Sequence, residues 1–117
     1  MISDDLEINS ETIEKIINFR NERNWSQFHN PKDLAISISL ESAELLECFQ
    51  WSGSDTEVTS KLEEMKEELS DIFIYSILLA DRLQINLDEV IQAKIAKNAE
   101  KYPVEKSFGK SSKYTEI

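Results

Sequence analysis

Two pairs of acidic residues lie in helix-like, otherwise apolar stretches of this 117-residue chain. Glu41 and Glu44 stand inside LAISISLESAELLECFQW, and Glu68 and Asp71 stand inside KLEEMKEELSDIFIYSILLADRL. A spacing of three residues places both carboxylates of a pair on one face of a helix. An ionised carboxylate in apolar surroundings needs a compensating partner, and Mg²⁺ and Mn²⁺ prefer carboxylate oxygens. The two pairs therefore predict a site for hard divalent cations.

The elements that must position these pairs are helices. Two Gly and two Pro leave few places for tight turns, and the apolar residues recur at steps of three and four. Asn30 followed by Pro31 is typical of a helix start, because Asn caps the first turn and Pro is accepted at the first helical position. We predict an all-α fold with four helices, at about 10–24, 31–51, 58–83 and 87–102.

The domain organisation follows from the length and from the end of this periodicity. A chain of this size is one small domain, which we place at residues 1–103. The remaining stretch, VEKSFGKSSKYTEI at 104–117, has no sustained apolar period. We expect it to be a flexible C-terminal tail.

A polar stripe runs along the predicted third helix in steps of three and four residues. The second helix carries a similar stripe that includes its own acidic pair. Facing stripes in an antiparallel helix hairpin would bring all four carboxylates around one cavity. The stripe on the third helix consists of Glu64, Glu68, Asp71, Tyr75, Leu78 and Arg82.

A second, mostly apolar seam on the third helix indicates self-association. Residues 72–80 are apolar on almost every side, more than three shorter helices can cover. We therefore expect a homodimer or a dimer of dimers, with this helix at the centre of an oligomeric helical bundle. The seam consists of Val58, Leu62, Met65, Leu69, Ile72, Ser76, Leu79 and Leu83.

The net charge, the cysteine count and the lengths of the apolar runs limit the partners and the cellular compartment that can be expected. With 23 acidic and 13 basic residues, the formal charge of −10 argues against a nucleic acid polymer as ligand. The single cysteine, Cys48, is compatible with a reducing cytoplasm. The longest apolar run is far too short to span a bilayer, and the N-terminus lacks a signal-peptide pattern. We expect a cytoplasmic protein without a membrane partner.

The sequence lacks the residues that other known classes of metal and phosphate site require. A di-iron carboxylate bundle needs Glu-x-x-His, but the only histidine, His29, does not follow a glutamate at that spacing. An EF-hand loop and a P-loop motif are both absent from the sequence. The acidic residues outside the two pairs, such as Glu57 and Glu63, fit a solvated helix face.

Four motifs follow one another along the chain: RNWSQFH at 23–29, the Glu41/Glu44 pair followed by FQW at 49–51, EELSD at 67–71 and AKNAEKYP at 96–103. In their order and spacing they resemble the motifs of the MazG-like all-α nucleoside triphosphate pyrophosphohydrolases, in particular the short dCTP pyrophosphatase-like branch. The resemblance covers roughly residues 19–103, and the order and spacing of its motifs are specific.

The resemblance implies Mg²⁺-dependent hydrolysis of an NTP or dNTP to the monophosphate and pyrophosphate, with Mn²⁺ as a substitute ion. Metal ions held by Glu41, Glu44, Glu68 and Asp71 would neutralise the triphosphate and activate the attacking water. One carboxylate must also accept the proton of that water. Glu44 is the first choice for this general base and Glu47 the second.

The same resemblance assigns the substrate contacts. By the pattern of the family, Lys94, Asn98 and Tyr102 contact phosphate or sugar, while Trp25, His29 and Trp51 approach the base. Lys101 lies with Lys94 and Asn98 on one side of the fourth helix, and Arg82 comes from the polar stripe of the third. Tyr75, one turn after Asp71, would close on the sugar. The alternative interpretation of the lysines is that they are solvated side chains near a helix C-terminus. The alternative for the tryptophans and Tyr75 is that they pack in the core or at a subunit interface.

We therefore predict a house-cleaning pyrophosphohydrolase that favours pyrimidine deoxynucleotides such as dCTP. The alternative is a non-catalytic, oligomeric helical interaction module whose acidic residues bind metal for structure only.

Overall fold

The computed structural model describes residues 3–116, which form helices and turns without any strand. Residues 1, 2 and 117 lie outside the described residues, so the outer ends of the two predicted ranges, 1–103 and 104–117, are not described. The chain divides into two compact units, one ending at Gln84 and the other beginning at Ile85. The prediction of an all-α fold is confirmed.

The first unit contains three helices: α1 (Ser10–Glu22), α2 (Pro31–Glu47) and α3 (Leu62–Leu83). The side chain of Asn9 caps α1 by accepting a hydrogen bond from the backbone N–H of Thr12. Asn30 caps α2 in the same way, with Pro31 at the first helical position, as the sequence predicted.

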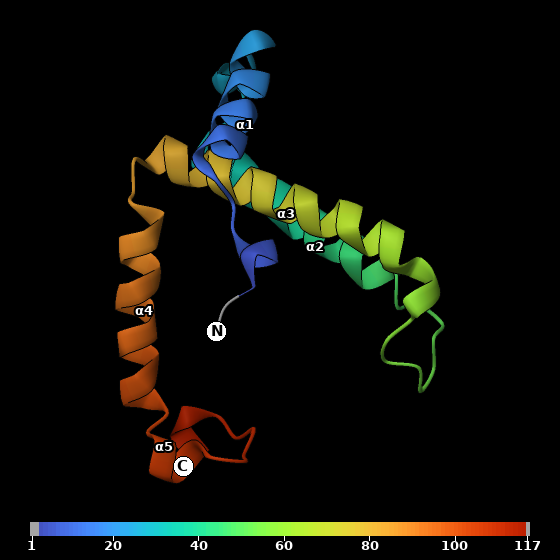
Figure 1. Ribbon diagram of the computed structural model, residues 1–117, viewed down its shortest axis with the longest axis vertical. Coiled ribbons are helices and arrows are strands. Elements are labelled where there is room, and N and C mark those ends of the chain that lie inside the picture. The colour runs from blue at the N-terminus through green and yellow to red at the C-terminus, as the bar shows by residue number, and fades with distance from the viewer. Residues whose placement is uncertain (1–2, 117) are drawn as a thin grey trace. The chain divides into compact units, whose positions relative to one another are not determined.

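Helices α2 and α3 lie side by side and antiparallel, and they form the largest packing interface of the first unit (Figure 1). Helix α1 packs on α3 near its C-terminal end, where Arg20 reaches Asp81 with Nη1 at 2.7 Å from Oδ2. The polar stripe of α3 faces these two helices: Leu78 is buried and Glu68, Asp71 and Tyr75 are half-buried. The hairpin predicted from the two stripes is thus present.

Two helix ends differ from the prediction by several residues. Helix α2 ends at Glu47 rather than near Trp51, because turns follow and Trp51 itself has a left-handed φ of 65°. Helix α3 begins at Leu62 rather than at Val58, which also has a left-handed backbone, with φ at 44°. A 3-10 turn at Thr59–Lys61 separates Val58 from the helix. Neither left-handed residue is Gly or Asn, so composition gave no signal for these breaks.

The core of the first unit is thin. In residues 3–116, the buried apolar side chains are those of Leu34, Cys48, Val58, Ile77, Leu78 and Ala80. Much of the seam on α3 stays accessible in one chain, since Leu62 and Leu69 are about half exposed, as is the adjacent Phe73. A single subunit therefore leaves a broad apolar surface along α2 and α3 in contact with water.

The second unit contains α4 (Leu87–Lys101) and the short α5 (Val104–Ser107), followed by a 3-10 turn at Tyr114–Glu116. The side chain of Asn86 caps α4 by accepting a hydrogen bond from the backbone N–H of Glu89. Residues 104–116 thus include two short helical segments, although their flexibility and the domain boundary at 103 stay predictions. No helix within residues 3–116 is long and apolar enough to cross a membrane.

Candidate active site

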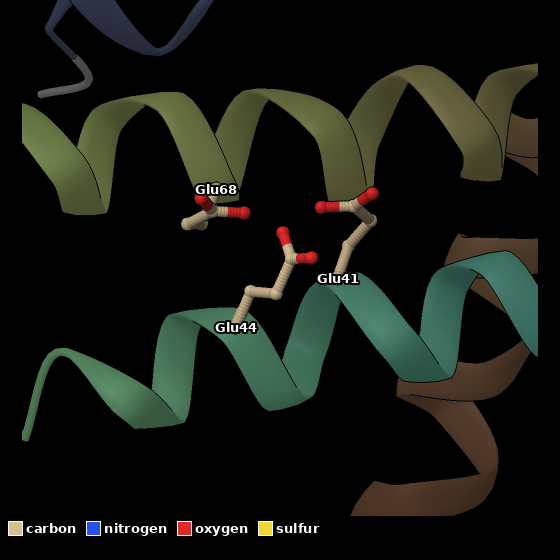
Figure 2. A group of neighbouring side chains, drawn as sticks. All are labelled: Glu41, Glu44 and Glu68. Atoms are coloured by element: carbon tan, nitrogen blue, oxygen red, sulfur yellow. The ribbon is translucent and has the colours of Figure 1, made fainter. Parts of the chain in front are cut away.

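Three carboxylates converge between α2 and α3. Glu41 and Glu44 come from α2 and Glu68 from α3, and Figure 2 shows their side chains pointing toward one another across the gap between the helices. One oxygen from each lies within 4.8 Å of the others. This convergence follows from the three-residue spacing in α2 and from the antiparallel register of the two helices. The sequence predicted these three residues as one cluster.

The carboxylate cluster lacks cationic compensation from the described residues. Oε2 of Glu41 and Oε2 of Glu68 are buried and have no hydrogen-bond partner within residues 3–116. Hydrogen bonding with Glu44 is the largest cause that raises the pKa of Glu68 to about 7, followed by desolvation and by the proximity of Glu41. Desolvation, followed by the proximity of Glu44 and Asp71, raises the pKa of Glu41, although hydrogen bonding with Glu68 opposes this shift. Oxygen ligands held this close fit a hard divalent cation, which would satisfy both unpartnered atoms.

Asp71, the fourth predicted ligand, lies beside this cluster. It follows Glu68 on the same face of α3, and its charge contributes to the raised pKa of Glu41. Asp71 also lines an adjacent apolar pocket. It therefore joins the two parts of the site.

The apolar pocket lies between α1, the turn that follows it, and the C-terminal half of α3. Its volume is about 310 Å³, at the small end of the range of about 300–1,000 Å³ that ligand pockets occupy. Tyr75 lies in its wall, and the pKa of Tyr75 is raised by burial and by the charges of Glu41, Asp71 and Glu44. Tyr75 thus borders both the pocket and the carboxylate cluster, which lie next to each other. The lining residues of the pocket are Thr12, Lys15, Ile16, Phe19, Arg20, Trp25, His29, Asp71, Ile74, Tyr75 and Leu78.

An aromatic wall built from α1 and the following turn closes one side of this pocket. Trp25 contacts Phe19 edge-to-face at 5.7 Å between ring centroids, and its ring lies 6.4 Å from that of His29. Burial and the nearby Arg20 lower the pKa of His29, which favours the neutral imidazole. Nδ1 of His29 is buried and has no partner within the described residues. The wall therefore offers an aromatic face and one neutral imidazole nitrogen to a ligand.

Arg20 is a pocket residue that the sequence reasoning missed. Its side chain is only 12% exposed, and its ion pair with Asp81 ties α1 to α3 at the edge of the pocket. The sequence feature that could have identified Arg20 is its position four residues after Ile16, on the apolar face of α1. A charged residue on an apolar helix face calls for a buried partner.

A wider groove runs along the other side of the carboxylate cluster. Glu44, Glu47 and Glu68 line it together with Glu64 and Lys61. Both carboxylates considered as general base, Glu44 and Glu47, therefore face the same space, and the choice between them stays open. Glu64, which belongs to the predicted polar stripe, lies at this groove as well.

The remaining predicted substrate residues belong partly to the first unit and partly to the second. Trp51 is 92% exposed on the turn after α2, and neither it nor Arg82 is among the residues that line the pocket. Lys94, Asn98 and Lys101 lie on α4 and Tyr102 directly follows it, so all four belong to the second unit. Their roles and that of Trp51 stay predictions.

The fold and the acidic cluster define a class of protein that comparison with known families identifies. The family model described as the MazG-like family matches residues 36–117, which include both acidic pairs and α4. The chain belongs to the MazG-like family. The resemblance inferred from the motifs is thereby confirmed.

Individual relatives narrow this assignment. The chain is 39% identical to "dCTP pyrophosphatase 1" of Mus musculus over 105 residues and 36% identical to the protein of that name of Homo sapiens over 104 residues. Each match covers 85% of this chain, and the chain spans 61% of the length of these curated relatives. A crystal structure of a pyrophosphatase from Archaeoglobus fulgidus is 40% identical and has a TM-score of 0.74. That match covers 83% of this chain and 99% of the archaeal chain.

Proposed function

We propose that this chain is a Mg²⁺-dependent nucleoside triphosphate pyrophosphohydrolase that releases a nucleoside monophosphate and pyrophosphate. The observation that carries the proposal is the shared boundary of the carboxylate cluster and the aromatic pocket. Asp71 and Tyr75 line the pocket, and both are electrostatically coupled to Glu41. A nucleotide has the matching layout, since its apolar base and its charged triphosphate are joined by a sugar.

In this proposal the pocket binds the base, and the carboxylate cluster lies at the triphosphate. The base enters the pocket and stacks on Trp25, while His29 offers its neutral ring nitrogen to the base edge. The sugar lies along Tyr75, and the triphosphate extends toward the carboxylates on α2 and α3. Lys94, Asn98, Lys101 and Tyr102 of the second unit contact phosphate or sugar.

Glu41, Glu44, Glu68 and Asp71 would hold the metal, with Mn²⁺ as a substitute for Mg²⁺. A bound divalent cation would neutralise the triphosphate and favour attack by water at the α-phosphorus. Glu44 or Glu47 accepts the proton of that water, because both line the groove beside the cluster. The unpartnered oxygens of Glu41 and Glu68 support metal binding at this point.

We propose deoxycytidine triphosphate as a preferred substrate. The support is the similarity to proteins named dCTP pyrophosphatase 1, together with the aromatic ring of Trp25 in the pocket, on which a pyrimidine can stack. A house-cleaning or pool-balancing role would follow from such a preference.

The test is incubation of the purified protein with a panel of NTPs and dNTPs and Mg²⁺, with products resolved by chromatography. We expect monophosphate and pyrophosphate, with dCTP among the fastest substrates. Release of a nucleoside diphosphate and orthophosphate would contradict attack at the α-phosphorus. No turnover of any nucleotide would favour the alternative, a metal-binding helical module without catalysis.

We propose further that the active protein is a homodimer or a dimer of dimers with α3 at its centre. The half-exposed Leu62, Leu69 and Phe73 support this, because burying each large apolar side chain contributes about 1.5–3 kcal/mol. An exposed Trp51 would then be free to approach a site on a neighbouring subunit. We also propose a cytoplasmic location and no polymeric nucleic acid or membrane as partner, consistent with the unpaired Cys48 and the net charge of −10.

Sizing chromatography with light scattering tests the assembly. We expect a mass of two or four times 13.5 kDa at micromolar concentration. Leu79→Glu should weaken assembly and activity together, because it places a charge in the seam of α3. A fully active species of 13.5 kDa would contradict the proposal.

A further inference from the structure

The segment that follows α4 folds back so that Tyr114 lies against the end of this helix. The ring of Tyr114 contacts that of Tyr102 edge-to-face, with centroids 6.1 Å apart and an angle of 81° between the ring planes. Nζ of Lys101 lies 5.0 Å from the centroid of the Tyr114 ring. Tyr114 thus contacts two adjacent residues that we assign to the triphosphate.

We call residues 103–116 the C-terminal hook. Its local sequence explains why the chain turns back toward the end of α4. Pro103 ends α4 and caps α5 by accepting from the N–H groups of Lys106 and Ser107. Gly109 reverses the chain with φ at +74°, a backbone conformation that glycine adopts without strain. A 3-10 turn then begins at Tyr114. The hook is therefore a succession of turns that all lie in the second unit.

The charge of this region differs in sign from that of the whole chain. Residues 94–116 contain six lysines and three glutamates, whereas the chain carries a net charge of −10. A concave surface of the hook, with a volume of about 360 Å³, is lined by Lys101 and Lys106 among others. Such a surface suits a polyphosphate better than the acidic remainder of the chain does. The family match also extends through the hook to residue 117.

We propose that Tyr114 is a positioning residue, which holds Lys101 and Tyr102 in the conformations that contact the phosphates of the substrate. The inference rests on the proposed function. A lysine side chain has many rotamers, and restricting it before the ligand arrives lowers the entropic cost of binding. The cation–π contact restrains Lys101 and the edge-to-face contact restrains Tyr102. Tyr114 would act on the substrate through these two side chains.

The kinetic test compares Tyr114→Ala, Tyr114→Phe and Phe108→Ala in the full chain. Tyr114→Ala should raise KM for dCTP about tenfold, with kcat within about twofold, because ground-state contacts to phosphate are weakened. Tyr114→Phe keeps the aromatic ring, so its KM should equal that of the wild type. Phe108, 86% exposed in the same hook, is the matched control, and its replacement should leave KM unchanged.

Unchanged kinetics in Tyr114→Ala would overturn the proposal. So would a Tyr114→Phe variant as impaired as Tyr114→Ala, since the ring would then not be the cause. An equal effect of Phe108→Ala would also contradict it, because any disturbance of the hook would then suffice.

A second readout does not depend on turnover. In the NMR spectrum, the ring current of Tyr114 should shift the ε-methylene signals of Lys101, and this shift should vanish in Tyr114→Ala. Titration with Mg²⁺ and pyrophosphate should move the Lys101 signals at about tenfold lower concentration in the wild type. If no nucleotide is hydrolysed but both NMR results hold, the proposed function fails and the positioning role stands. If the Lys101 signals of the wild type and of Tyr114→Ala moved at the same pyrophosphate concentration, the positioning role would be contradicted, whether or not the protein hydrolyses nucleotides.

Discussion

The apolar pocket and the carboxylate cluster lie next to each other in the first unit, yet their physical demands are opposite. The pocket is built from packed rings and aliphatic side chains, and it is complete without a ligand. The cluster consists of three converging carboxyl groups, and two of their buried oxygens have no partner within the described residues. Under the proposed function, the pocket would contribute to substrate selection and affinity, whereas the cluster would contribute to the reaction.

The largest expected effect comes from neutralising the cluster. Glu68→Gln and Glu41→Gln should each lower kcat by about a hundredfold or more while the protein stays helical, because a metal ligand is lost but the shape is kept. Steady-state kinetics at saturating Mg²⁺ and circular dichroism measure the two parts of this expectation. Glu63→Gln is the control, since Glu63 lies on the exposed face of α3 and pairs only with Lys66. Near-normal rates in both cluster variants would refute the metal site.

Changing the pocket should affect binding instead of the chemical step. Trp25→Ala removes the aromatic face and should raise KM for dCTP about ten- to hundredfold, because stacking on one base contributes about 1–3 kcal/mol. The value of kcat should change by much less than in Glu68→Gln. A loss confined to kcat, with KM unchanged, would show that the pocket does not hold the base.

The ion pair at the edge of the pocket should have a smaller effect, mainly on stability. Asp81→Ala removes the carboxylate that lies 2.7 Å from Nη1 of Arg20, whose side chain is 12% exposed, and leaves the guanidinium only its hydrogen bond to Asn21 among the described residues. We expect a loss of about 1–3 kcal/mol in the free energy of unfolding, measured by denaturant titration. The matched surface pair is Lys66 with Glu63, where Glu63→Ala should change stability by less than about 0.5 kcal/mol. Equal effects of the two variants would mean that Arg20 does not need its partner.

The smallest expected effect is the pH dependence of stability without metal. The pKa of Glu68 is about 7 in the folded protein and has an ordinary value of 4.5. Between these values the folded state binds more protons than the unfolded state, so the contribution of Glu68 to stability rises as pH falls from 7 to 4.5 and is lost above pH 7. Thermal unfolding in a chelator should therefore show Glu68→Gln gaining stability over the wild type at pH 8 and losing that advantage near pH 5. A pH-independent difference would contradict the coupling of the carboxylates.

The carboxylate cluster was predictable from the sequence because it depends on local spacing. Glu41 and Glu44 share a helix face whatever the rest of the fold does, and only one further step, the antiparallel pairing of α2 with α3, brings Glu68 to them. The cap at Asn30 was predictable for the same reason, since its hydrogen bond to the N–H of Asp33 spans three residues. Local patterns thus carried most of the prediction of the cluster.

The pocket depends on packing between distant segments, and sequence patterns predicted it less well. Trp25 and His29 came from the family resemblance, but Phe19 and Arg20 became pocket residues only through the way α1 packs on α3. The end of α2 and the start of α3 were missed because left-handed residues, Trp51 and Val58, stand at positions where glycine would have indicated a break. Packing and backbone conformation of this kind are decided by tertiary contacts rather than by local propensity.

The most direct test of the central claim, that pocket and cluster form one site, measures the linkage between metal and nucleotide. The chain has two tryptophans, so Trp51→Phe leaves Trp25 as the only one. Titration of this variant with a non-hydrolysable α,β-imido analogue of dCTP, followed by Trp25 fluorescence, gives the Kd with and without Mg²⁺. The account predicts that the analogue alters Trp25 fluorescence, that Mg²⁺ lowers Kd about tenfold or more, and that Glu68→Gln removes this effect of Mg²⁺. An unchanged Kd with and without Mg²⁺, or a Glu68→Gln variant that keeps the full Mg²⁺ effect, would contradict a single shared site.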